Sequence, residues 1–447
     1  MGAERFNTAD LIEKDKRLYH PNVIDAQRVI IVGGDGCIVR DSTGREYLDC
    51  HSASWTTQVG HGRKELIDAA HRQLQAIPMY SPYWEFANEP AIELADWLVK
   101  KSPRNLTHVR YGSSGSECDD EAMQMVRHYH RSRGEPERTI ILTHKGCYHG
   151  RSSGAWTLAG HGDPSMFKDG IVYQLTQPLP YHTEQYKGQS LTDYCVRELE
   201  ETISRIGARR IAGLFGELVI GPGGMTAPPK DYWPRMAEVL RRNGILFVAD
   251  EVVSAFGRCG DWFAANIYGV EPDIIVMAKG IASGYIPLGA ILHTTDVAEG
   301  VKTLYSGGSY GGHATACAAA VANMQVIERE DLCRNARERG AQFLAELQPL
   351  LDLPFVGDVR GSGLMMAIEL VRNKTSREPV TSVSYTDFSR AMRDKHGILI
   401  GTFGNHIVIM PPLVITAAQV SRVTRSIGAV LHDLANDPEL KAELAGA

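Results

Sequence analysis

Short apolar runs, each followed by turn residues or a helical pattern, recur through the middle of the chain. The four clearest, which we predict to be β-strands, are 138–144, 210–220, 244–252 and 272–279. Residues 231–244 instead repeat their apolar positions with a helical period, and Gly244 suits the end of that helix. Strands and helices in alternation predict an α/β fold, with a mostly parallel sheet covered by helices on both faces.

The two ends of the chain follow a different pattern. Beyond about residue 326, a helix-like segment precedes two strand-like segments at 355–370 and 404–416, as in a small α+β domain. Two short strands around a turn in residues 36–50 are expected to join that domain. We therefore predict a small-domain segment at 1–60, a large domain at 61–325 and a C-terminal small domain at 326–447.

Composition narrows the functional class. With 447 residues, 43% hydrophobic and 22% charged, the chain is typical of soluble globular proteins. A net charge of -6 gives no basis for binding nucleic acid, and no apolar run reaches the roughly 18 residues of a membrane span. The first twenty residues lack the apolar segment of a signal peptide. The eight cysteines form no C-x-x-C pair, so we predict a reduced, cytoplasmic setting and no metal site.

Two predicted strands end in a residue suited to chemistry. Lys279 follows the apolar run 274–278, and Asp250 ends the run 245–249. A lone lysine at a strand end usually extends into solvent, and a lone aspartate often caps a turn. Burial would lower the pKa of the lysine, and the neutral amine could then form a Schiff base with a carbonyl. The aspartate could hold a proton on the ring nitrogen of pyridoxal phosphate. Parallel strands bring such ends to one edge of the sheet.

A third segment, at residues 111–127, suits phosphate binding. Ser114, Gly115 and Ser116 form a small-residue turn that leads directly into a predicted helix. The free N–H groups of a helix N-terminus can bind a phosphate, although the same pattern is common in ordinary helix caps. In the fourth segment, 144–150, Tyr148 could stack on a flat heteroaromatic ring.

Together these segments resemble the class III pyridoxal-phosphate-dependent aminotransferases, the omega-transaminase group of fold type I. The resemblance is strongest in "DEVVSAFGRCG" (250–260) and "AKGIASGYIPLGA" (278–290), and it extends over almost the whole chain. It implies a large domain around a mostly parallel sheet of seven strands, with a small α+β domain built from both ends. It also implies pyridoxal 5'-phosphate as the cofactor and a homodimer with shared active sites.

The resemblance assigns roles to individual residues. Lys279 corresponds to the lysine that binds the cofactor and moves the proton, and Asp250 to the partner of the ring nitrogen. The other cofactor positions are Gly115 and Ser116 at the phosphate, Tyr148 and Val252 on the two ring faces, Glu217 near the aspartate, and Ser309, which reaches the neighbouring subunit's phosphate. Trp55, together with Tyr148, corresponds to the wall of the substrate pocket.

Departures from the family pattern concern the substrate. Gly401 stands where many omega-transaminases have an arginine for the donor's carboxylate, and Arg258 or Arg151 is the candidate replacement. In "GELVIGPGG" (216–224), Leu218, Ile220 and Pro222 replace the usual Pro, Gln and second Glu. The predicted pocket segments are rich in neutral polar groups: Ser54, Thr56, Thr57, Tyr80, Ser81, Thr402 and Asn405. This set suits a hydroxylated or amine-bearing substrate better than a dicarboxylate.

We therefore predict a ping-pong aminotransferase for small-molecule amine and carbonyl substrates. One expected acceptor is an oxo amino sugar of aminoglycoside-type antibiotic biosynthesis. An omega-amine:pyruvate transaminase for small aryl or alkyl amines is the alternative within the same class. A second alternative, an aminomutase or epimerase, would use the same Lys279 and Asp250 but release no keto product.

Overall fold

A seven-stranded sheet forms the centre of the computed structural model, which describes residues 7–19, 28–80, 85–159, 172–381 and 385–446. In sheet order, its strands are β4 (Leu106–Gly112), β10 (Gly289–Thr294), β9 (Ile274–Met277), β8 (Leu246–Asp250), β7 (Ile211–Glu217), β5 (Ile140–His144) and β6 (Val172–Leu175). β10 pairs antiparallel with both neighbours, and the other pairings are parallel. The mostly parallel α/β sheet predicted from the sequence is confirmed, and all four predicted strands are present, each shorter than its apolar run.

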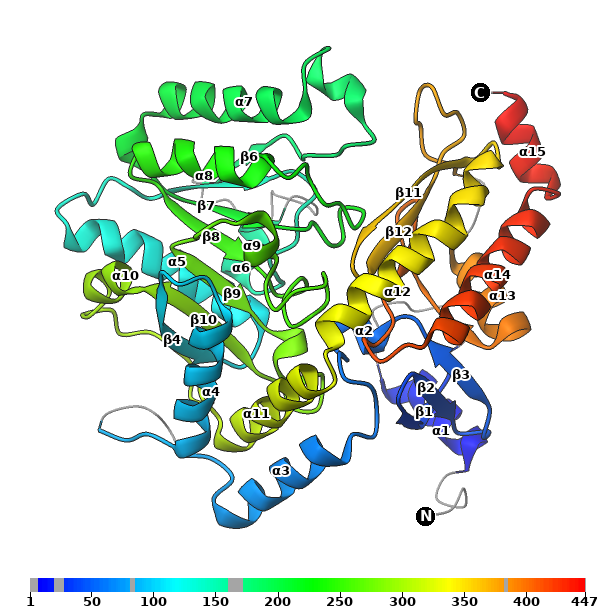
Figure 1. Cartoon of the computed structure of the whole chain (residues 1–447), viewed down its shortest axis with the longest axis horizontal. Helices are drawn as coiled ribbons and strands as arrows, with labels where there is room; N and C mark the ends of the chain where they lie inside the picture. The colour runs from blue at the N-terminus through cyan, green and yellow to red at the C-terminus, as the bar shows by residue number, and fades with distance from the viewer. Residues whose placement is uncertain (1–6, 20–27, 81–84, 160–171, 382–384, 447) are drawn as a thin grey trace.

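Alternation along the strands explains why helices cover both faces of this sheet. In β8, Leu246 and Val248 pack in the same apolar cluster as α5 (Gly115–Ser132), whereas Phe247 and Ala249 pack in the cluster that contains α8 (Tyr232–Arg242). Successive strand residues point to opposite faces, so a continuous apolar run is buried on both sides. α7 (Leu191–Ile206) and α8 therefore lie on one face of the sheet and α5 on the other, as can be followed in Figure 1.

The predicted helix at 231–244 is also confirmed, as α8. Asn243 is its C-cap, and Gly244 follows with a φ of 64°, the left-handed conformation that glycine adopts without strain.

Two smaller sheets involve the ends of the chain. The first contains β1 (Ile31–Asp35), β2 (Ile38–Asp41), β3 (Glu46–Asp49) and β13 (Ile398–Leu399); the second contains β11 (Val356–Ser362), β12 (Met365–Leu370), β15 (His406–Ile409) and β14 (Gly401–Phe403). Because β3 pairs parallel with β13, segments about 350 residues apart share one sheet, as a small domain built from both ends requires. The domain boundaries themselves stay a prediction.

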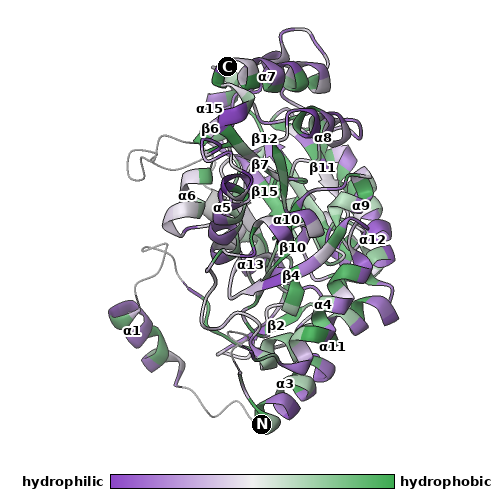
Figure 2. Cartoon of the chain, turned by 90° about the vertical axis from the view of Figure 1, so that its left-hand side faces the viewer, coloured by the Kyte–Doolittle hydropathy of each residue, from purple (hydrophilic) through white to green (hydrophobic). Residues whose placement is uncertain are grey.

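The remaining helices surround these sheets, except for one. They are α2 (Ser52–Trp55), α3 (Lys64–Ala76), α4 (Glu89–Lys101), α6 (Ser153–Leu158), α9 (Ala264–Tyr268), α10 (Thr295–Gly300), α11 (Ala314–Arg329), α12 (Leu332–Leu347), α13 (Tyr385–His396), α14 (Ala417–Leu434) and α15 (Pro438–Ala445). The exception, α1 (Thr8–Leu18), buries no residue and contacts the rest of the chain through the Thr8 hydroxyl, which donates to the Ser42 carbonyl oxygen at 3.0 Å; Figure 2 shows it at the edge of the molecule. Among the helices described, none is both long and apolar enough to cross a membrane.

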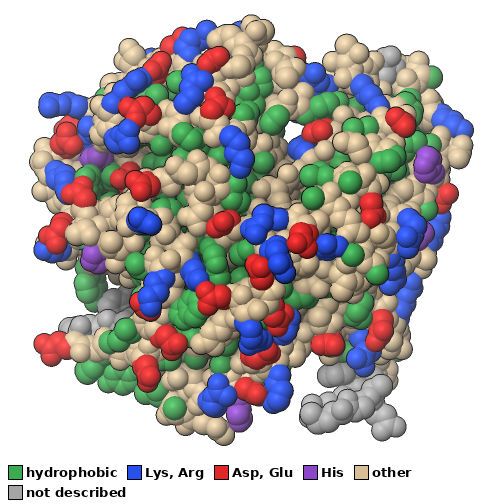
Figure 3. Space-filling model, in the orientation of Figure 1, with side chains coloured by type: hydrophobic (Ala, Val, Ile, Leu, Met, Phe, Trp, Pro, Cys, Tyr) green, Lys and Arg blue, Asp and Glu red, His purple; other side chains and the backbone are tan. Residues whose placement is uncertain are grey.

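Charged side chains of both signs are interspersed over the face shown in Figure 3, without a large region of one sign. This face therefore presents no basic surface of the kind that binds nucleic acid.

Candidate active site

Five chain segments meet at the carboxyl edge of the seven-stranded sheet. Strand register places Glu217 beside Asp250 and Asp250 beside Val276. β9 ends at Met277, and the loop that carries Lys279 follows. β5 leads here into the loop with Tyr148, and β4 leads into the N-terminus of α5. The carboxyl edge is where open α/β sheets bind their ligands.

A cavity of about 350 Å³ lies at this edge. Its lining includes Gly115, Ser116, Tyr148, Asp250, Val252 and Lys279, all predicted site residues. It also includes Asp119 and His149, to which the sequence analysis gave no role. The structure thus brings most of the predicted residues together, although their roles in binding and catalysis stay predictions.

Lys279 stands at the start of a tight turn that follows β9. Its φ of 39° is left-handed, which is uncommon for a residue with a side chain and stores strain. The Asn323 amide, from α11, donates to the carbonyl oxygens of Gly280 (2.8 Å) and Ile281 (3.0 Å) and holds the turn. Burial lowers the pKa of the Lys279 ammonium, although the nearby carboxylates of Asp250, Glu217 and Asp119 oppose that shift. The turn therefore presents a lysine poised to lose its proton.

Asp250 is buried and held by two hydrogen bonds. Its Oδ1 accepts from the Val252 N–H at 2.9 Å, and its Oδ2 lies 2.7 Å from His149 Nδ1. Burial alone would lower the pKa of His149, but Cys147 and the bond and charge of Asp250 raise it well above its usual value. Thr143 Oγ1, at 3.2 Å from His149 Nε2, fixes the other side of the ring. These contacts fix the position of the Asp250 carboxylate.

Glu217 lies behind the cavity wall rather than on it. Its Oε1 accepts from the Tyr148 N–H (2.8 Å) and its Oε2 from the Gly221 N–H (2.9 Å), so it joins two loops at the sheet edge. Burial and the charge of Asp250 raise the pKa of Glu217 to about 7. Glu217 lies next to Asp250 in the sheet, as predicted. Its hydrogen bond to the Tyr148 N–H shows that it also supports the loop that carries Tyr148.

The N-terminus of α5 borders the cavity at closely packed small residues. The Ser114 hydroxyl caps the helix by accepting from the Glu117 N–H at 3.2 Å. A Cβ atom on Gly115 would lie 2.9 Å from Val252 Cγ2, closer than normal packing allows. The Ser116 hydroxyl accepts from the Arg151 N–H at 3.1 Å and thereby holds the neighbouring loop. Glycine at 115 is therefore required by space.

Besides Glu217, two predicted residues, Trp55 and Ser309, lie outside the cavity lining. Trp55 is partly buried and ends four consecutive residues with left-handed φ angles, from Ser52 (47°) to Trp55 (69°). Thr56, the next residue, does line the cavity. Ser309 is exposed on the loop between α10 and α11. The predicted reach of Ser309 to a neighbouring subunit remains untested by a single chain.

The neutral polar residues predicted for the pocket are dispersed. Beyond Thr56, Ser54 and Tyr80 are exposed and Thr57 is buried. Thr402 and Asn405 are partly buried on the β14–β15 hairpin, and Ser81 lies outside the described residues. Of this set, only Thr56 borders the cavity among the residues that the structure describes.

Neither candidate replacement for the arginine missing at Gly401 reaches the cavity. Arg258 is fully buried, where its guanidinium donates to the carbonyl oxygens of Pro411 (2.6 Å) and Leu364 (3.1 Å). It also donates to the Gln58 side chain, so its role is structural. Arg151 is exposed and is not among the lining residues.

The structure also gives a physical reason for Gly401. A Cβ atom at this position would lie 2.8 Å from Cδ2 of His51 and 3.4 Å from its Nε2. The imidazole of His51 thus stands where the first atoms of a side chain at 401 would be. His51 belongs to a segment 350 residues earlier in the chain, so no local sequence pattern indicates this contact.

His149 and Asp119 are the residues that sequence reasoning missed. Both stand in patterns that have ordinary explanations: His149 lies in a glycine-containing loop, and Asp119 lies near a helix N-terminus, where carboxylates complement the dipole. A carboxylate oxygen of Asp119, a ring nitrogen of His149 and a carboxylate oxygen of Asp250 lie within 4.8 Å of one another, the spacing of a possible metal site. The absence of a metal stays a prediction.

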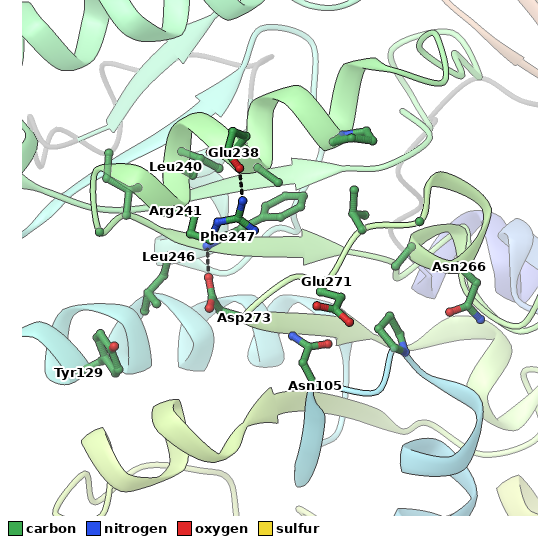
Figure 4. A pocket seen from close by; sticks show the side chains of 18 residues that line it. Asn105, Tyr129, Glu238, Leu240, Arg241, Leu246, Phe247, Asn266, Glu271 and Asp273 are labelled. Carbon is green, nitrogen blue, oxygen red and sulfur yellow. Dashed lines mark hydrogen bonds and ion pairs between the residues drawn. The ribbon is translucent and has the colours of Figure 1, made fainter.

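A second, larger hollow of about 740 Å³ lies at the opposite, amino edge of the sheet (Figure 4). There Arg241 pairs with Glu238, and Asp273 accepts a hydrogen bond from the Phe247 N–H at 2.8 Å. Burial raises the pKa of Asp273 to about 6. Among the described residues that line this hollow there is no lysine or histidine, so the amine and imidazole of the carboxyl edge have no counterpart in that lining.

Comparison with known proteins identifies the family. The family model for class III aminotransferases matches residues 19–431. A putrescine–pyruvate aminotransferase from Pseudomonas aeruginosa is 34% identical over 403 residues, which is 88% of this chain and 88% of that protein.

Solved structures agree. An (S)-enantioselective omega-transaminase from Thermomicrobium roseum superposes with a TM-score of 0.90 at 36% identity, covering 97% of this chain and 100% of that one. An amine transaminase from an uncultivated Pseudomonas species, in its PLP-bound form, gives 0.89 at 36% identity over 93% and 98%. The fold type I architecture and the pyridoxal 5'-phosphate cofactor predicted from the sequence are thereby confirmed.

Proposed function

The chain belongs to the class III aminotransferases, and from this premise we propose that it moves an amino group from a small amine to an aldehyde or ketone in two half-reactions. The observation that carries the proposal is the placement of Lys279 and Asp250 on the wall of one cavity at the carboxyl edge of the sheet. One residue supplies an amine and the other a buried carboxylate.

The residues around the cavity fit pyridoxal 5'-phosphate. Gly115 and Ser116, at the N-terminus of α5, would hold the phosphate with backbone N–H groups. Tyr148 and Val252 would contact the two ring faces, and Asp250 would hold the ring nitrogen. Because Gly115 has no side chain, Val252 can pack closely against this end of the helix. When bound, the cofactor supplies a carbonyl that takes up the amino group and a ring that withdraws electrons.

The chain's own groups would then manage protons. Lys279, with a pKa lowered by burial, would take a proton from the substrate carbon and return one. Asp250 would keep the ring nitrogen protonated, because His149 and the Val252 N–H hold its carboxylate in place. Glu217 would hold the loop that presents Tyr148.

For the substrate, we propose an amine donor that needs no carboxylate. A side chain at Gly401 would have to displace the His51 imidazole, and Arg258 is bound to backbone carbonyls. The named relatives act on putrescine and on amines, which favours the omega-amine alternative. The oxo amino-sugar acceptor and a role in antibiotic biosynthesis stay predictions. The names of the three similar proteins described above do not mention an amino sugar. The aminomutase alternative has no observation in its favour.

We also propose a homodimer with shared active sites. Tyr305 and Tyr310, which flank Ser309, are 86% and 63% exposed in the single chain. Exposed aromatic side chains of this kind are typical of protein interfaces. A partner subunit seated there would bring its cofactor site near Ser309.

A half-reaction tests the function directly. Enzyme loaded with the cofactor is mixed separately with putrescine, an aryl-ethylamine, a 6-amino sugar, L-alanine and L-glutamate, and the cofactor's absorbance is followed. We expect the amines to convert the cofactor to its aminated form at least about tenfold faster than the amino acids, the effect of one missing charge-assisted contact. Equal or faster conversion by glutamate would overturn the substrate proposal, and turnover without any carbonyl product would indicate an isomerase.

A further inference from the structure

Asp119 is a buried carboxyl group without a partner in the wall of the cofactor cavity. It lies one turn into α5, its side chain is fully buried, and neither of its oxygens has a hydrogen-bond partner within the described residues. The neighbouring Asp120 differs, because its Oδ1 accepts from the Ala155 N–H at 2.6 Å. Buried carboxylates normally accept hydrogen bonds, so an isolated one is unexpected unless it carries a proton.

The surroundings of Asp119 are mainly acidic. The titratable groups that face it are Asp250, His149, Asp120, Glu217 and Lys279. Of the two carboxyl groups that share the cavity wall, Asp250 receives the hydrogen bonds, from Val252 and His149, and Asp119 receives none. Hydrogen bonds to a carboxylate favour its charged form, so the negative charge belongs on Asp250. Burial, reinforced by the charge of Asp250, raises the pKa of Asp119 well above its usual value.

We propose that Asp119 is a positioning residue that keeps its proton and directs its O–H toward the Asp250 carboxylate, so that the two groups together carry one negative charge. The inference rests on the proposed role of Asp250 at the ring nitrogen. If both carboxyl groups were ionised, their charges would repel each other in a buried wall. If Asp119 keeps its proton, only one charge is buried and a hydrogen bond joins the two groups. Asp119 would thus orient the group that holds the ring nitrogen without touching the reacting atoms.

The test compares Asp119→Asn with Asp119→Ala in the full chain. Asparagine has the shape of the protonated acid, and its amide can donate to Asp250, whereas alanine leaves Asp250 without this donor. We expect D119N to keep kcat/KM within about threefold of the wild type, and D119A to lose about 10- to 100-fold, the effect of a hydrogen bond to a charged group. Asparagine would also restore a merely space-filling role, so Asp119→Leu, which fills similar space without a donor, is the control. We expect it to lose as much activity as D119A, and activity near that of the wild type would overturn the proposal.

Stability against pH gives a readout that does not depend on activity. In the unfolded chain Asp119 loses its proton near pH 4, whereas the folded chain keeps it to higher pH. The folded state therefore binds more protons in between, and wild-type stability falls relative to D119N as pH rises. Thermal unfolding of the cofactor-free chain between pH 4 and 8 should show the Tm advantage of D119N growing as pH rises above 4.

Asp273→Asn is the matched control. Asp273 is another aspartate with a raised pKa, but it lies at the amino edge of the sheet, so its Tm advantage should stop growing near pH 6 and activity should not change. A Tm difference between D119N and wild type that does not vary with pH would overturn the proposal. So would equal losses of activity in D119N and D119A, or one bound divalent metal per chain that D119N abolishes. If no transaminase activity is found, the proposed function fails, while the pH dependence of unfolding still tests the protonation of Asp119.

Discussion

At the carboxyl edge of the seven-stranded sheet, Lys279, Asp250 and Asp119 face one cavity; at the amino edge, Asp273 and Arg241 border a larger hollow. Both edges contain an aspartate whose pKa is raised by burial. Neither the volume of a hollow nor an aspartate with a raised pKa is therefore enough to identify the active site.

The edges differ in how their groups converge. At the carboxyl edge, a lysine with left-handed backbone, a carboxylate fixed by histidine and an unpartnered carboxyl meet within one small space. At the amino edge, Arg241 pairs with the adjacent Glu238, and Asp273 bonds a backbone N–H. Convergence of groups that alter one another's charge, together with strained backbone, is what marks a functional site.

The largest effect is expected from Lys279→Ala, at the carboxyl edge. Without the amine, proton transfer loses its acid and base, so kcat should fall by about 10⁴-fold, the upper end for general acid–base catalysis. Steady-state kinetics with an amine donor gives the result. Retention of a tenth of wild-type activity would show that another group moves the proton.

Asp250→Asn should have the next largest effect. The amide keeps the shape of the carboxylate but removes its charge, and kcat should fall by about 10²- to 10³-fold, as when one preorganised polar group is lost. Asp273→Asn, measured alongside, should change kcat less than twofold because Asp273 faces the other edge. Similar losses in both variants would mean that the two edges do not differ in function.

His149→Ala should have an intermediate effect. Its loss would free Asp250 Oδ2, and a positioning hydrogen bond to a charged group accounts for about 10- to 100-fold. Because Asp250 and its charge remain, the loss should be smaller than in D250N. A loss in His149→Ala larger than that in D250N would assign the histidine a direct role in the reaction.

The smallest effect expected is on stability at the amino edge. The folded-state pKa of Asp273, about 6, exceeds the usual aspartate value, so its stability contribution falls as pH rises from about 4 to 6. Asp273→Asn should therefore stabilise the chain at pH 7 by roughly 1 kcal/mol, less than the full shift because the side chain is partly exposed. Thermal unfolding at pH 4 and pH 7 checks this, and the gain should be absent at pH 4.

Sequence reasoning found the parts of the site that local patterns reveal. Lys279 and Asp250 each end an apolar run, and Gly115 begins a helix after a small-residue turn. Parallel pairing then brings such ends together, so the sheet and the cavity wall followed from the order of the elements.

The missed features depend on contacts between distant segments. His149 and Asp250 are 101 residues apart, and the Gly401–His51 contact joins segments still farther apart. Asp119 lies near a helix N-terminus, where carboxylates are common, and the sequence does not show that this one is buried close to Asp250. For the same reason, Arg258 was a reasonable substrate-binding candidate until its carbonyl partners were seen.

The most direct test of this account is to find the lysine that holds the cofactor. Enzyme loaded with pyridoxal 5'-phosphate is treated with borohydride, which makes the lysine–cofactor link permanent, and its peptides are mapped by mass spectrometry. We predict a single modified site, Lys279, and no such modification in Lys279→Ala. Modification of a different lysine, or a cofactor held without any lysine link, would contradict the assignment of the carboxyl edge as the active site.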